Sequence, residues 1–361
     1  MATSVPAVAD ADVEASTSAS ESTGSQAPSE TRRVVVLAGG YGGAKLSHGL
    51  DLVRAARAVT GTAIELTIIV NTGDDLELHG LLVSPDLDTV LYTLAGLANT
   101  ETGWGVHAET WSNAEMLDRY GAPTWFRLGD RDLATHLLRT QRIRAGLSLT
   151  RVTGELAAAL GVTARILPMS DGPVRTRVRT DHGWLDFQDY FVRRHHEDAV
   201  RELRFQGIED AVPTQEVNAA IQAADVVVFA PSNPFVSIGP ILRLSGVAKG
   251  IREARGRRVP VIGVSPIVGG AALRGPADRM FESLGGQASA AGVARHYAEA
   301  HPDLLTTLII DETDAADAPS VEATGIRATL AQTVMRSDDD RHALAETVLA
   351  VAGSAFAVAA A

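Results

Sequence analysis

Short apolar runs alternate along the chain with longer stretches in which apolar residues recur every three or four positions. The short runs, rich in Val and Ile, cover residues 34–37, 64–70, 225–230, 259–264 and 304–310. Runs of this kind are typical of strands that are buried on both faces of a mostly parallel sheet. Helical periodicity lies between them, for instance over 46–59 and 242–255. The alternation predicts a Rossmann-like, doubly wound α/β fold, whose ligands bind beyond the carboxyl ends of the strands.

A different pattern occupies the middle of the chain. Residues 174–178 alternate between apolar and polar, 181–183 are a turn-like Asp-His-Gly, and a second short segment follows at 184–187. This order predicts a β-hairpin. We therefore expect a single α/β domain over 31–361 with a small antiparallel insertion near 165–210.

The two ends of the chain differ from the rest in composition. After Met1, residues 1–30 contain no Leu, Ile, Met or aromatic side chain. Such a segment buries too little apolar surface to offset its ordering entropy, so we expect a disordered tail, and it lacks the pattern of a secretory signal. The apolar run 348–361 is shorter than the ~20 residues of a membrane span, and we expect the frayed end of a packed helix.

Charge and cysteine content narrow the class of ligand. The 361 residues include 44 acidic and 32 basic side chains, a net charge of −12, and no cysteine. The acidic balance argues against nucleic-acid binding. The lack of cysteine excludes disulfides, thiolate metal sites and a Cys nucleophile, and it fits a cytoplasmic protein. Any anionic ligand must be held locally, by backbone N–H groups, single Arg residues or a metal ion.

A glycine-rich segment at 39–45, Gly-Gly-Tyr-Gly-Gly-Ala-Lys, follows the first apolar run and opens a helical stretch. Glycines there allow backbone N–H groups to approach a phosphate at a helix N-terminus. The spacing fits neither the dinucleotide fingerprint nor the P-loop. A tight turn without a ligand stays open as an alternative, and Lys45 is either a phosphate contact or a solvated helix residue. The candidate phosphate-binding residues are Gly39, Gly40, Gly42, Gly43 and Lys45.

Polar residues also follow three later apolar runs, where a doubly wound sheet binds its ligands. They are Asn71, Thr72 and Asp74 after the second run, Ser232 and Asn233 after the third, and Ser265 after the fourth. Each segment alone is also typical of an Asx-rich or Pro-bounded turn. Several such turns at successive strand ends favour a ligand crevice.

Acidic residues cluster at a predicted helix start. Ser84 is a candidate N-cap, and Asp86 is explained by the helix dipole, whereas Asp88 lies two residues further on. With Asp74, Asp88 is a candidate ligand pair for a hard cation, since Mg²⁺ typically takes one or two carboxylates and shares the rest with phosphates and water.

Two other clusters are ambiguous. Arg127 follows Trp125 and Phe126, which is typical either of a surface helix start or of an Arg that contacts a flat or anionic ligand. His195 and His196 suggest a metal site, but adjacent His residues on a helix point apart, so we expect none there. No HExxH or GxSxG motif occurs, which argues against a metalloprotease or an α/β-hydrolase.

Together these motifs resemble those of the 2-phospho-L-lactate transferase family, the CofD and FbiA proteins. The most distinctive strings are Ser-Pro-Asp-Leu-Asp-Thr-Val-Leu-Tyr at 84–92 and Leu-Gly-Asp-Arg-Asp-Leu-Ala-Thr-His at 128–136. Others, in consistent order, lie at 36–45, 70–75, 167–171, 187–190, 231–234, 237–241 and 263–267.

The resemblance implies a Rossmann-like domain with a smaller inserted part, usually as a homodimer. It also implies transfer of a phospholactyl or phosphoenolpyruvyl group from a guanosine diphosphate-linked donor to the terminal ribityl hydroxyl of the deazaflavin Fo. GMP leaves, Mg²⁺ is required, and the product belongs to the synthesis of coenzyme F-420. The Ala- and Arg-rich composition favours the actinobacterial, enolpyruvyl version.

By the same resemblance Asp88 and Arg127 fall on Fo-binding positions, although the family often has Lys in place of Arg127. Phosphoryl-type transfer needs positioning and charge neutralisation, which the glycine segment and Mg²⁺ on Asp74 and Asp88 would provide. Asp88 is also a candidate acceptor of the hydroxyl proton.

Two other functions remain open. A nicotinamide-dependent oxidoreductase would place an acidic residue about twenty residues after the glycines, where 52–60 supplies only Arg54 and Arg57. A non-catalytic nucleotide-binding regulator would explain the glycines but not the paired acids.

Overall fold

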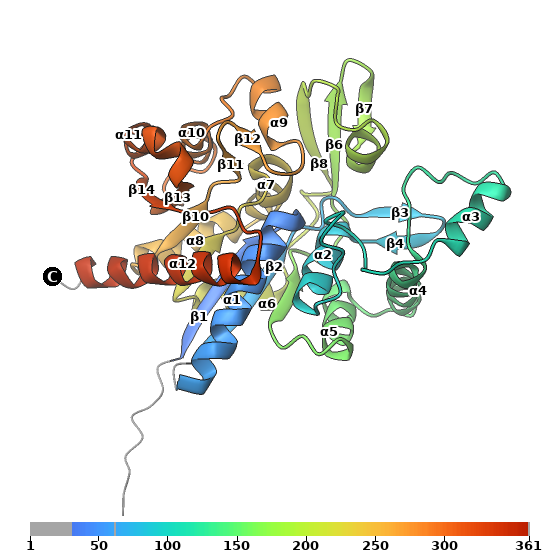
Figure 1. Cartoon of the computed structure of the whole chain (residues 1–361), viewed down its shortest axis with the longest axis horizontal. Helices are drawn as coiled ribbons and strands as arrows, with labels where there is room; N and C mark the ends of the chain where they lie inside the picture. Colours follow the sequence, from blue (N-terminus) through green and yellow to red (C-terminus); the bar gives the residue numbers. More distant parts are fainter. Residues whose placement is uncertain (1–30, 61–62, 360–361) are drawn as a thin grey trace, which may run out of the picture.

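The computed structural model describes residues 31–60 and 63–359, and these form a doubly wound α/β fold (Figure 1). The predicted tail at 1–30 lies outside the described residues. The central sheet has seven parallel strands in the order β14-β13-β10-β9-β1-β2-β5. Its strands are β1 Arg32–Ala38, β2 Ile64–Val70, β5 Arg165–Pro168, β9 Val226–Phe229, β10 Val261–Val264, β13 Thr307–Asp311 and β14 Arg327–Ala331.

Helices cover both faces of this sheet. Val34 and Val36 of β1 pack with one layer of helices, whereas Val35 and Leu37 pack with the other, because successive strand residues point to opposite faces. The first layer contains α1 Gly40–Thr60, α2 Pro85–Leu94, α5 Leu149–Ala159 and α12 Asp338–Ala359, with α12 beside α1 (Figure 1). The second contains α6 Gln215–Ala223, α7 Gly239–Arg243, α8 Val247–Gly256, α10 Ala290–Ala300 and α11 Ala318–Glu322.

Smaller elements extend from this core. The predicted hairpin is confirmed as β6 Arg175–Thr180 and β7 Gly183–Asp186, and β8 Glu202–Gln206 joins it in an antiparallel sheet. A second hairpin, β3 Leu76–Leu78 with β4 Leu81–Val83, extends to one side with α3 Ser112–Arg119 and α4 Asp130–Arg144 (Figure 1). The remaining elements are β11 Ile267–Val268, β12 Ala271–Ala272, α9 Ala277–Ser283, a 3₁₀ helix at Glu312–Asp317, and π-helical turns at Asp189–Arg193 and Pro234–Ile238.

Three details differ from the sequence-based expectations. The predicted helix at 242–255 is interrupted before α8, because Gly246 adopts a left-handed conformation with φ of 93°. Ser84 is the N-cap residue of α2 as expected, but its side chain makes no capping hydrogen bond: its hydroxyl donates to the Asp75 carboxylate at 2.9 Å. The edge strands β5 and β14 were not predicted.

The sheet has one switch point, and it lies between β1 and β9. From β1 the chain proceeds outward through β2 and β5 on one side, and from β9 through β10, β13 and β14 on the other. The connections leave these two neighbouring strands in opposite directions, which opens a crevice at their carboxyl ends. Within the described part of the chain, no helix has both the length and the apolar character needed to cross a bilayer.

Candidate active site

A cavity of about 900 Å³ lies beyond the carboxyl ends of β1 and β9, at the switch point. Most of the residues singled out in the sequence line it: Gly39, Gly40, Gly42, Lys45, Asp74, Asp88, Arg127, Ser232, Asn233 and Ser265. Gly43, Asn71 and Thr72 are buried and are not part of its wall. The structure therefore brings segments that are distant in sequence to one cavity.

The glycine segment is packed tightly against the loop that follows β9. A Cβ at Gly42 would collide with the carbonyl oxygen of Pro231, and a Cβ at Gly39 would collide with Asp86 and Ser237. The Ser232 hydroxyl accepts a hydrogen bond from the Gly39 N–H at 3.1 Å and donates one to the Gly39 carbonyl at 2.8 Å. These glycines therefore permit close approach between two loops.

Asp86 joins α2 to the same segment. Its carboxylate accepts hydrogen bonds from the Gly40 N–H at 2.7 Å and from the Asn71 side chain at 2.9 Å. The N–H groups of Gly39 and Gly40, two of the predicted phosphate donors, are thus bonded within the protein. Asp86, which the sequence explained by the helix dipole alone, is a structural contact of the site.

The other polar strand-end residues mainly close turns. Asn71 accepts the Gly73 N–H at 2.8 Å, and Asn233 accepts the N–H groups of Phe235 and Val236. The Ser265 hydroxyl donates to the Ile267 carbonyl at 2.9 Å. The turn interpretation is therefore correct for these side chains, while Asn233 and Ser265 also line the cavity.

Lys45 bridges two walls of the cavity. Its Nζ donates to the Met335 carbonyl at 2.5 Å and lies 4.5 Å from the centre of the Tyr41 ring. Burial and the Arg341 charge lower its pKa. The Arg274 guanidinium lies 4.7 Å from the same Tyr41 ring, so this aromatic ring carries two cations at the cavity wall.

Three carboxylates, of the buried Asp74 and Asp86 and the partly buried Asp75, follow β2 and begin α2. Burial and the neighbouring Asp86 raise the pKa of Asp74 well above its usual value. Burial also raises the pKa of Asp75 to about 7 and that of Asp86 to about 6. Asp74 Oδ1 is buried and has no hydrogen-bond partner. Unneutralised carboxylate oxygens in a cavity are the donor set that Mg²⁺ prefers.

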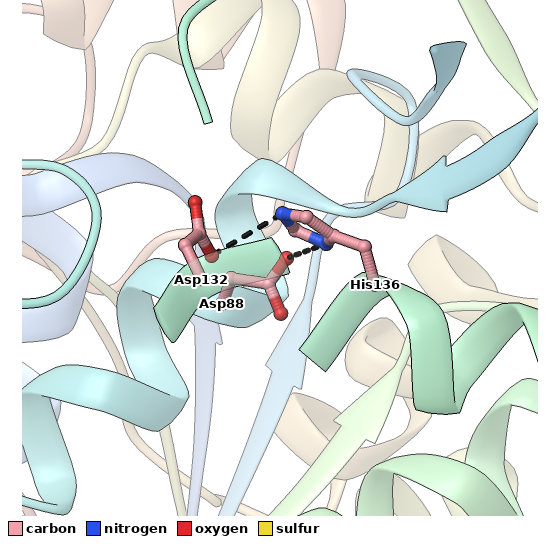
Figure 2. Close-up of side chains that lie close together, drawn as sticks. All are labelled: Asp88, Asp132 and His136. Carbon is pink, nitrogen blue, oxygen red and sulfur yellow. Dashed lines mark ion pairs between the residues drawn. The ribbon is translucent and has the colours of Figure 1, made fainter. Parts of the chain in front are cut away.

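Asp88 has a different environment from Asp74. Both of its oxygens contact the Arg139 guanidinium, with Oδ2 at 3.0 Å from Nη1. Asp132 and His136 lie beside it, and Figure 2 shows the His136 ring between the two carboxylates. Among its charged neighbours, Asp86 and Asp75 raise the pKa of Asp74. The pairing of Asp74 with Asp88 on one cation stays a prediction.

Arg127 is exposed at the cavity wall and stacks on an aromatic ring. Its guanidinium carbon lies 4.4 Å from the centre of the Trp111 ring, which precedes α3. The neighbouring Trp125 and Phe126 pack edge to face at 5.8 Å. The aromatic partner of Arg127 is therefore distant in sequence.

The antiparallel insertion supplies another part of the wall. Phe187 and Phe191 stack with ring centres 5.6 Å apart, and the His196 ring lies 5.2 Å from Phe191. The expectation that His195 and His196 lie on a helix is wrong: both have positive φ, 52° and 47°, in the turn after a π-helical segment. Both line the cavity.

Comparison with known proteins shows a matching family and solved structures with a similar fold. Residues 34–351 match the model of the family described as 2-phospho-L-lactate transferase CofD. A phosphoenolpyruvate transferase of Streptomyces griseus is 45% identical over 325 residues, covering 89% of this chain and 98% of its own. The corresponding protein of Kitasatospora aureofaciens is 43% identical with the same coverage.

An archaeal relative and a solved structure are also similar. A 2-phospho-L-lactate transferase of Methanosarcina acetivorans is 39% identical over 316 residues, covering 88% of this chain and 98% of its own. The crystal structure of a UPF0052-family protein from Bacillus halodurans superposes with a TM-score of 0.60 at 15% identity, covering 89% of this chain and 99% of that one. At that identity the likeness supports the α/β fold alone.

Proposed function

Because the chain belongs to the 2-phospho-L-lactate transferase CofD family and is a transferase, we propose that it uses Fo as acceptor. In this reaction the terminal ribityl hydroxyl of Fo attacks the phosphorus that carries enolpyruvate in a guanosine diphosphate-linked donor. The new P–O bond replaces the bond to GMP, which leaves, and the product is a precursor of coenzyme F-420. The enolpyruvyl donor is proposed because the relatives at 43% and 45% identity are named phosphoenolpyruvate transferases.

The single observation that carries the proposal is one cavity whose wall combines groups suited to two different ligands. The start of α1 contributes Tyr41 and Lys45, an aromatic face and a cation for a nucleotide diphosphate. Asp88 and Arg127, the latter stacked on Trp111, also line the cavity and suit a flat ring with a hydroxylated chain. A donor and an acceptor side by side gain rate from orientation.

We also propose that Mg²⁺ binds at this site. The buried, unpartnered Asp74 Oδ1 and the adjacent Asp86 fit a hard cation. Of the two ligands predicted from the sequence, Asp74 fits better, since Arg139 already neutralises Asp88. When bound, the cation would neutralise charge on the donor diphosphate as a Lewis acid.

The roles of the acceptor residues follow from their surroundings. Asp88 accepts the proton of the ribityl hydroxyl, and the Arg139 guanidinium contacts both of its oxygens. Arg127, braced by Trp111, presents a planar cation that can stack on the acceptor ring.

Binding measurements separate the proposal from its two rivals. Pure protein is mixed with Fo, GDP or NADH in turn, and its melting temperature and the Fo fluorescence are followed. We expect Fo and GDP each to raise the melting temperature, and NADH to have no effect. Stabilisation by NADH would favour an oxidoreductase, and stabilisation by GDP without Fo binding would favour a nucleotide-binding regulator.

A further inference from the structure

A row of buried side chains on α4 lies directly behind Asp88. Asp132, His136 and Arg139 are four and three residues apart, so they share one face of the helix. Their exposed fractions are 7%, 1% and 1%, and that of Asp88 on α2 is 5%. Buried charges are costly unless each is paired, so such a row requires an explanation.

The contacts form one continuous chain. The Arg139 guanidinium contacts both oxygens of Asp88, and its Nη1 also lies 3.2 Å from His136 Nδ1. Because a guanidinium is only a donor, Nδ1 accepts, and the neutral ring carries its proton on Nε2. Nε2 lies 3.2 Å from Asp132 Oδ1 but makes no hydrogen bond with it, and the Tyr92 hydroxyl donates to that same oxygen at 2.8 Å. Hydrogen bonds from Arg139 and Tyr92 thus hold the two carboxylates, and the His136 ring lies between them.

A metal ion is a poorer explanation of this cluster. One ligand atom from each of Asp88, Asp132 and His136 lies within 4.8 Å of the others (Figure 2). The Arg139 guanidinium, however, contacts both Asp88 and His136, so an entering cation would meet a fixed positive charge. The cluster is better suited to holding a carboxylate still.

We infer that Arg139 and His136 are positioning residues that hold the Asp88 carboxylate at the cavity wall in the orientation that the acceptor hydroxyl requires. This inference rests on the proposed function. Arg139 itself is not part of the cavity wall, so it acts through Asp88. The bidentate contact with both Asp88 oxygens needs a planar guanidinium, whereas a Lys ammonium offers only a point charge.

The test is a double-mutant cycle between Arg139 and Asp88. Arg139→Lys should lower kcat by at least about tenfold, with KM for the guanosine donor within about twofold of wild type. In the Asp88→Asn background the same change should cost less than about twofold, because its effect passes through the lost carboxylate. Arg142→Lys, on the same helix with a side chain 51% exposed, is the matched control and should leave kcat unchanged.

Fo affinity, followed by fluorescence, gives the cycle a second readout where turnover is too slow to measure. If Arg139→Lys does not fold, His136→Asn takes its place with the same expected pattern. If Arg139→Lys lowers kcat as much in the Asp88→Asn background as in wild type, the inference is wrong. Mn²⁺ binding to the wild-type protein that His136→Asn abolishes would also overturn it. A wild-type protein that makes no product rejects the proposed function itself, whereas an active wild type with an additive cycle rejects only the positioning roles.

Discussion

The Asp74 carboxylate lies in the protein interior with one oxygen unpartnered and Asp86 beside it. Burial of this kind disfavours the charged form, so the folded state keeps protons that the unfolded chain has released. The stabilisation from the protonated acids is complete below the ordinary carboxyl pKa near 3.8, and it is lost as the pH rises through about 6 for Asp86 and about 7 for Asp75. Ionisation then costs at most roughly 3 kcal/mol for Asp86 and roughly 4 kcal/mol for Asp75.

We predict that Asp74→Asn stabilises the protein at pH 8 while lowering its activity by at least about tenfold, equivalent to ~1.4 kcal/mol of barrier. The melting temperature of the variant should fall less than that of wild type between pH 5 and pH 8. Melting curves across this range, with wild type as reference, measure the effect. A variant that is less stable than wild type at pH 8 would show that the Asp74 charge supports the fold.

Arg127 offers a test of the proposed acceptor site. We predict that Arg127→Ala raises KM for Fo about tenfold or more while KM for the guanosine donor changes little, because we propose that its guanidinium stacks on the acceptor ring. Arg127→Lys should be partly active, since the charge survives. Arg131→Ala, a neighbouring exposed side chain, is the control. Equal effects of Arg127→Ala on both substrates would indicate a structural role.

Single residues were predictable where their position in the fold pattern was informative. Asp74 follows a strand end and Asp88 lies at a helix start, and both side chains line the cavity. Arg139 could not be singled out, because a charged residue in a helix with many charges is usually a solvated one. Its role depends on α4 packing against α2, a contact between elements that no local pattern encodes.

Among the elements, the loops that follow β1 and β9 pack so closely that Gly42 has no room for a side chain beside Pro231. We predict that Gly42→Ala destabilises the protein and lowers the affinity for the guanosine donor, because the new Cβ collides with the backbone of Pro231. Gly154→Ala in α5, where a Cβ meets open space, should be neutral or stabilising by up to about 1 kcal/mol. Melting temperatures and donor binding of the two variants test this, and equal behaviour would refute the packing argument.

The five apolar runs were confirmed as β1, β2, β9, β10 and β13, since strands covered on both faces have a strong local signal. The sequence pattern did not predict the edge strands β5 and β14, for two different reasons. β5 is four residues long and ends in Pro168, and β14 has several partly exposed side chains. The single helix expected over 242–255 was divided because a left-handed Gly246 starts α8 anew.

At the scale of the whole molecule, the strand order decides where the chemistry lies. Loops that follow different strands converge at the one switch point between β1 and β9, and the aromatic stack of the insertion lines the same cavity. The sequence pattern predicted the doubly wound class and the crevice. It could not place α4 or the aromatic stack around the cavity, because their positions depend on contacts between segments far apart in the chain.

Product analysis tests whether the protein transfers the phosphoenolpyruvyl group to Fo. The purified protein is incubated with Mg²⁺, Fo and, separately, guanosine diphosphate-linked donors that carry enolpyruvate or lactate, and the products are identified by mass spectrometry. We expect Fo to gain a phosphoenolpyruvyl group and one GMP to be released for each product molecule. We expect the lactyl donor to react more slowly and EDTA to stop the reaction. Unchanged Fo with both donors, or GMP release without a phosphorylated Fo product, would contradict the proposed transfer.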